Sequence, residues 1–99
     1  MASENSPETI LSLAQGFMEC RIFHAAAELN LFTVLDQTPL SAGEVASRIS
    51  GDVRALAVLL DALTAMGLLV KRGQTYQCED DISRMLSEKS PHTILPMVL

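Results

Sequence analysis

Residues 52–66 read Asp-Val-Arg-Ala-Leu-Ala-Val-Leu-Leu-Asp-Ala-Leu-Thr-Ala-Met, and this stretch decides the fold. Asp52 suits the N-cap of a helix, and Gly67 is the residue type favoured just after a helix ends. Between them, large apolar residues recur every three or four positions, which predicts an amphipathic helix with one buried face. The residues that hold this period are Leu56, Leu59, Leu60, Leu63 and Met66, and the first four of them are the predicted core residues.

The outer face of this predicted helix carries very little charge. Arg54 is its only cation, and Asp52 and Asp61 outweigh it. A helix that reads DNA needs Arg, Lys, Asn or Gln to contact base edges and phosphates. Ala, Val and Leu fill most of these positions instead, so the pattern indicates that the outer face contacts protein.

The neighbouring segments indicate which fold this helix belongs to. Ser41 and Glu44 form a capping box that starts a shorter helix upstream. Downstream, residues 68–71 and 75–78 are typical of two strands joined by a short turn. Two helices followed by a hairpin predict a winged helix-turn-helix, a mainly α fold with a small β-hairpin.

The N-terminal part predicts a long helix over residues 7–29. It starts with the Ser-Pro-Glu sequence of residues 6–8, and Asn30 suits a left-handed stop. At 100° per residue, the apolar face of this helix swings about half a turn between Gly16 and Cys20. Either the helix breaks near Gly16, or its two halves pack against different bodies.

We favour the second explanation, because the chain has surplus apolar surface to cover. Large apolar groups dominate protein–protein contacts, so they are the best candidates for interface anchors on this extended N-terminal dimerisation helix. The candidate dimer-interface residues are Leu11, Phe17, Met18, Ile22 and Phe23.

Composition limits the class of protein. The chain has 99 residues, a net charge of −5, 48% hydrophobic residues and only 4% aromatic residues. One helical domain fits this size and composition. The negative charge argues against nucleic acid and anionic membranes as partners, because both require cations on the protein.

The absence of a long apolar run and of a signal-peptide pattern favours a cytoplasmic protein without a membrane segment.

The cysteines and histidines offer one candidate metal site. Cys20 and His24 are four residues apart on the predicted N-terminal helix, and Cys78 and His92 would complete a Cys2His2 set. No CxxC or HxxxH pair supports this set, so a buried Cys20 beside a half-exposed histidine is the simpler interpretation. Free thiols are expected for both cysteines, with a disulfide left open.

The charged clusters have ordinary explanations. Lys71 and Arg72 form a cationic wing tip, which touches phosphates in DNA-binding proteins but is here expected to be solvated. The acidic run at residues 79–81 is expected to cap a short helix from Asp80 or Asp81, and Ser90-Pro91 to start another. The chain has no GxSxG, P-loop, HExxH or Gly-rich dinucleotide turn. We therefore expect no catalytic, cofactor-binding or metal-binding residue in this chain.

Several segments of the sequence, in their order along the chain, resemble the N-terminal dimerisation domain of the S-adenosylmethionine-dependent small-molecule O-methyltransferases. The residues that carry the likeness lie in the segments 28–35, 40–46, 54–63, 67–69, 73–76 and 90–92. The resemblance implies a homodimer with intertwined N-terminal helices. It also implies that the module covers the acceptor pocket of a Rossmann-like catalytic domain, which supplies the S-adenosylmethionine site and the catalytic histidine.

On this basis, residues 1–99 are expected to form one winged-helix dimerisation domain. It would comprise a disordered tail at 1–6, the helix at 7–29, the winged-helix core at 31–79 and a helical segment at 80–99 that leads to an absent catalytic domain. The parent enzyme is expected to O-methylate a small molecule, and this piece alone to be inactive. The alternative is a winged-helix DNA-binding transcription regulator.

Overall fold

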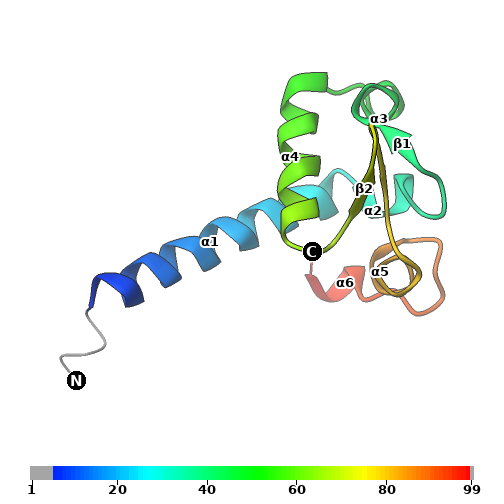
Figure 1. Ribbon diagram of the computed structural model, residues 1–99. Coiled ribbons are helices and arrows are strands. Elements are labelled where there is room, and N and C mark those ends of the chain that lie inside the picture. Colours follow the sequence, from blue (N-terminus) through cyan, green and yellow to red (C-terminus); the bar gives the residue numbers. More distant parts are fainter. Residues whose placement is uncertain (1–5, 99) are drawn as a thin grey trace.

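The computed structural model describes residues 6–98 and consists mainly of helices around a small sheet (Figure 1). The predicted tail at 1–6 lies outside the described residues except for Ser6, which caps the first helix. The elements are α1 (Pro7–Glu28), α2 (Leu31–Val34), β1 (Leu40–Ser41), α3 (Ala42–Ile49), α4 (Val53–Ala65), β2 (Val70–Arg72), β3 (Thr75–Gln77), α5 (Asp80–Leu86) and α6 (Leu95–Val98).

The predicted starts of three helices are confirmed, and in each a side chain caps the backbone. The Ser6 hydroxyl accepts a hydrogen bond from the Thr9 amide at 3.2 Å, and Asp52 accepts from the Arg54 amide at 2.8 Å. Ser41 and Glu44 form the full capping box at the start of α3. Each cap satisfies backbone amides that a helix start leaves without a partner.

The turns after α1 and α4 adopt the backbone conformations that their sequences predict. Asn30 lies in the left-handed region at φ 62°, and Gly67 does so at φ 84°. Short polar side chains and glycine tolerate this region better than other residues. Both turns redirect the chain so that the next element packs back on the core.

The sheet has three antiparallel strands in the order β1-β3-β2. The β2–β3 hairpin was predicted, but β2 begins at Val70 rather than Leu68 because residues 68 and 69 still complete the turn after α4. β1 was not predicted, because its two residues carry no periodicity. Leu40 pairs with Tyr76 and thereby ties the segment before α3 to the wing.

The core lies between α2, α3, α4 and the sheet, and it contains the face predicted for α4. Leu56, Leu60 and Leu63 are buried, and Leu59 packs against them from the edge. Phe32 and Val45 have no exposed surface and fill the centre. The helix–turn–helix α3–α4 followed by the β2–β3 hairpin confirms the predicted fold class.

α1 is one unbroken helix of 22 residues, so the predicted alternative of a break near Gly16 is wrong. Figure 1 shows its C-terminal half lying against α4 and its N-terminal half extending away from the body. The two halves therefore have different surroundings, as the change of apolar face indicates. Within the described residues, no helix is both long and apolar enough to cross a membrane.

The C-terminal segment differs from the prediction in two places. α5 begins at Asp80, and Glu79 occupies its N-cap position without a side-chain hydrogen bond. Ser90-Pro91 starts a turn rather than a helix, because the Ile94 amide donates to the Met85 carbonyl at 2.7 Å and pulls the chain back onto α5. α6 therefore begins only at Leu95, whose side chain closes the core.

Truncating the core of α4 tests this packing. Leu60 has no exposed surface, so Leu60→Ala is expected to lower the free energy of unfolding by about 2–5 kcal/mol. Val58 is 72% exposed on the same helix, and Val58→Ala is expected to change it by no more than about 0.5 kcal/mol. Denaturant titrations at one fixed protein concentration measure both; equal losses would contradict the assignment of the buried face.

Candidate dimerisation surface

The N-terminal half of α1 carries an unusual amount of bare apolar surface. Five large side chains there are each more than half exposed: Ile10 54%, Leu11 67%, Leu13 67%, Phe17 63% and Met18 62%. Isolated exposed apolar residues are normal, whereas a cluster of this kind marks an interaction surface. These five residues are called the apolar arm below.

The arm has little to hold it in the folded monomer. Its helix is started by Ser6 and Pro7, and every residue from Pro7 to Arg21 except Thr9 is exposed. A helical segment of this length without tertiary packing is only marginally stable in water. Packing against a second body would both cover the apolar side chains and stabilise the helix.

The five predicted interface residues fall into two groups. Leu11, Phe17 and Met18 belong to the exposed arm. Ile22 and Phe23 are partly buried against the core, and the Phe23 and Phe32 ring centroids are 5.9 Å apart. The assignment of all five to an interface stays a prediction. Ile10 and Leu13 were not among the five, although at 100° per residue they lie on the same side of the helix as Phe17.

Polar residues mark the point where α1 leaves the body. The Arg21 guanidinium lies 5.8 Å from the centre of the Phe17 ring, and His24 Nδ1 lies 2.9 Å from Glu28 Oε1. Cys20 is exposed, so its predicted burial is wrong. Periodicity places Cys20 on the apolar face of the first half, but residues 10–21 are all exposed and burial against the body begins only at Ile22.

The candidate Cys2His2 set does not assemble. Cys20 is exposed on α1, whereas Cys78 is buried in the core with its thiol 3.8 Å from the Phe32 carbonyl oxygen. Burial raises the pKa of the Cys78 thiol to about 12, so the thiolate needed for metal binding is disfavoured. No group of three or more potential metal ligands occurs within residues 6–98. Both cysteines are free thiols.

The outer face of α4 is apolar where a DNA reader would be charged. Val58 is 72% exposed and Val53 is 50% exposed. Lys71 on the wing is not free to contact a phosphate, because its ammonium lies 3.1 Å from the Asp61 carboxylate. The same carboxylate oxygen accepts a hydrogen bond from the Tyr76 hydroxyl at 2.5 Å. This three-residue contact fastens the wing to α4.

The contact changes the titration of its members. The Tyr76 hydroxyl and then the Lys71 ammonium hold the pKa of Asp61 below its ordinary value. The Asp61 carboxylate in turn raises the pKa of Lys71. Burial, followed by the neighbouring Asp61, raises the pKa of Tyr76. At neutral pH the contact is therefore an ion pair with a protonated tyrosine.

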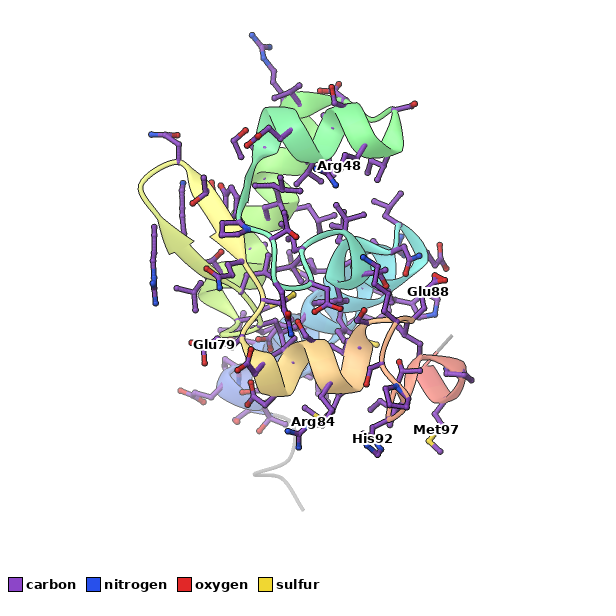
Figure 2. The ribbon with its side chains drawn as sticks, turned by 90° about the vertical axis from the view of Figure 1, so that its right-hand side faces the viewer. Arg48, Glu79, Arg84, Glu88, His92 and Met97 are labelled. Carbon is purple, nitrogen blue, oxygen red and sulfur yellow. The ribbon has the colours of Figure 1, made fainter. Side chains whose placement is uncertain are left out.

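Two of the concave surfaces on the body differ in polarity. A polar cavity of about 440 Å³ is lined by both acids and bases, among them Asp36, Arg84 and His92. Figure 2 shows Arg84 and His92 along one edge of the molecule, near α5 and the loop after it. A more apolar groove of about 280 Å³ lies between Leu29 and the start of α4. This groove adjoins α1, so it is the more relevant of the two to a surface built on that helix.

The exposed apolar helix is typical of a protein-interaction module, and the comparison with known families agrees. The chain belongs to the O-methyltransferase dimerisation domain family, whose model matches residues 11–89. The chain spans only about a quarter of the length of its curated relatives.

Individual relatives are methyltransferases. The chain is 38% identical to the tetracenomycin polyketide synthesis 8-O-methyl transferase of Streptomyces glaucescens over 86 residues, which cover 86% of this chain and 25% of that protein. It is 34% identical to the acetylserotonin O-methyltransferase of Rattus norvegicus over 91 residues, covering 91% of this chain and 21% of that protein.

Solved structures share the fold. An O-methyltransferase family protein from Burkholderia thailandensis superposes with a TM-score of 0.84 at 31% identity, over 95% of this chain and 28% of the other. Human N-acetylserotonin methyltransferase in complex with S-adenosylmethionine has a TM-score of 0.79 at 28% identity, over 99% of this chain and 31% of the other. These matches give no support to the alternative of a DNA-binding regulator.

The contact between the wing and α4 predicts a pH dependence. A carboxyl group with a lowered pKa in the folded state adds stability above its unfolded pKa of about 3.9 and loses it as the pH falls through the folded value. Asp61→Asn is therefore expected to lower the melting temperature at pH 7, and this difference should shrink below about pH 4. Thermal melts followed by circular dichroism measure it. A difference that is the same at pH 3 and pH 7 would show that the charge is irrelevant.

Proposed function

We propose that this chain pairs two copies of a methyltransferase subunit through α1 and helps to enclose the pocket for the methyl acceptor. The observation that carries the proposal is the apolar arm, whose five large side chains are all more than half exposed. Covering them with a second chain removes apolar surface from water, at about 25 cal/mol per Å². Membership in a dimerisation-domain family supports the same role.

The parent reaction would be methyl transfer from S-adenosylmethionine to a hydroxyl group of a small molecule. Relatives named for polyketide and acetylserotonin O-methylation support this reaction class. The residues of this chain do not fit a cofactor site themselves, since the five glycines are scattered at positions 16, 43, 51, 67 and 73 without a Gly-rich turn. The cofactor and the reacting groups would therefore be held by other parts of the enzyme.

We further propose a cytoplasmic location and no nucleic-acid or membrane partner. The two free cysteines support a reducing compartment. The net charge of −5 would repel the phosphates of nucleic acids and of anionic lipids. The module thus works through protein contacts.

Sedimentation analysis tests the dimer. The 99-residue chain is expected to be a dimer at micromolar concentration, and the double variant Leu11→Glu with Met18→Glu is expected to be a monomer, because it places charges in the apolar contact. Ser12→Glu is the matched control, since Ser12 is also exposed on α1 and is not apolar. Circular dichroism verifies that each variant folds. A wild-type chain that sediments as a monomer would overturn the proposed function.

A further inference from the structure

The polar cavity of about 440 Å³ is formed by three separate parts of the chain. They are the turn after α2, the helix α5 and the loop that precedes α6. The lining consists of Asp36, Gln37, Asp80, Ser83, Arg84 and residues 89–92. The volume falls within the range of small-molecule sites, about 300–1,000 Å³, so the cavity has room for a ligand.

Buried hydrogen bonds hold the walls of the cavity in place. Ser87 has no exposed surface. Its hydroxyl donates to Asp36 Oδ2 at 2.9 Å and accepts from the Lys89 amide at 3.2 Å. The Ser90 hydroxyl accepts from the His92 amide at 3.1 Å and closes the loop. Because these contacts join the loop to the turn after α2, a ligand would lose little affinity to reorganisation of the walls.

Three basic side chains converge on this cavity without acidic partners. Arg84, Lys89 and His92 all line it, and none of the three forms an ion pair within residues 6–98. Figure 2 shows Arg84 and His92 on the same edge of the molecule. The chain has only seven Lys and Arg against twelve Asp and Glu. A group of unpaired bases in so acidic a chain favours an anionic ligand, because it raises the local potential.

Two serine hydroxyls add hydrogen-bonding capacity to the same wall. Ser83 is 5% exposed, and its hydroxyl has no hydrogen-bond partner of ordinary geometry among the described residues. The Cys78 thiol beside it is a weak partner. Ser90 accepts from a backbone amide, which leaves its hydroxyl hydrogen to donate. A phosphate group offers three strong acceptor oxygens, so it suits this set of donors better than a halide does.

The acidic side chains of the cavity restrict the rest of the ligand. Asp36 and Asp80 line it together with the bases. Carboxylates accept hydrogen bonds from hydroxyl groups and repel a second negative charge. A ligand that suits both sides therefore has one anionic end and an uncharged end with hydroxyl groups.

We propose that this cavity binds a small hydroxylated phosphate ester. Arg84, Lys89 and His92 hold its phosphate, and Asp36 and Asp80 accept hydrogen bonds from its hydroxyl groups. The site lies on the body and contains no residue of the apolar arm. It therefore stands or falls separately from the proposed dimer.

Titration of the nitrogen-labelled chain, followed by heteronuclear NMR at fixed pH and chloride concentration, tests the site. Glycerol phosphate is expected to bind in the millimolar range and to shift the amide signals of residues 83–92. Inorganic phosphate is expected to bind at the same residues about threefold more weakly or worse, because it lacks the hydroxyl contacts. Glycerol alone is expected to cause no shifts there. Inorganic phosphate that binds as tightly as glycerol phosphate would overturn the assignment of the hydroxyl groups to the acids.

Paired variants separate the site from the overall charge. The double variant Arg84→Gln with Lys89→Gln is expected to raise the dissociation constant for glycerol phosphate about tenfold or more, because two charge-assisted contacts are lost. The control, Arg48→Gln with Arg54→Gln, removes the same charge from exposed side chains outside the cavity, and Figure 2 shows Arg48 far from Arg84 on α3. It is expected to change the constant by no more than about twofold.

Circular dichroism verifies that both double variants fold, and all four replaced side chains are exposed. Equal weakening by the two double variants would overturn the proposal, because attraction would then depend on net charge alone. The absence of glycerol phosphate shifts in residues 83–92 at tens of millimolar ligand would overturn it as well.

Discussion

The packing of the second half of α1 into the body is the constraint on which the rest of the structure depends. Ala26 and Ala27 are almost completely buried, and their small side chains let the helix axis approach the core closely. Phe23 packs against Phe32 and fixes the rotation of the helix about its axis. Because α1 is continuous, holding one half determines where the other half points and which of its side chains are presented.

The body has the helix–turn–helix and wing of DNA-binding proteins but not the charge pattern that such proteins use. The order of α3, α4 and the wing is kept, but the exposed positions of α4 include Val53 and Val58. The Lys71 ammonium, which a phosphate contact would require, is engaged by Asp61. Phosphate contacts supply a large share of the affinity of DNA-binding proteins, so the ion pair with Asp61 engages one cation that such a contact would use.

Local signals in the sequence predicted the elements that local interactions stabilise. Ser6, the Ser41–Glu44 box and Asp52 each bond to amides within three residues, so capping rules were sufficient to place three helix starts. The periodicity of α4 predicted its buried face, because that helix packs on one body.

The features that the sequence did not predict depend on contacts between residues that are distant in the chain. β1 exists because Leu40 meets Tyr76, and α6 starts late because residue 94 bonds back to Met85. The exposure of Cys20 depends on where the body ends along α1, which periodicity cannot measure. The candidate surface was predicted from the change of apolar face, but Ile22 and Phe23 pack against the core through contacts that periodicity does not specify.

Because the apolar arm projects beyond the core, the contacts that fold the chain are different from those that the arm offers to a partner. The buried cluster runs from Ala26 to Leu95 and contains none of the arm residues. Under the proposed function, one chain would therefore acquire its native core in a first-order process and meet its partner afterwards in a second-order one. Under the proposed function, subunits that fold before they associate would also part and re-form without unfolding, so chains of two related enzymes with matching apolar arms would be able to exchange partners.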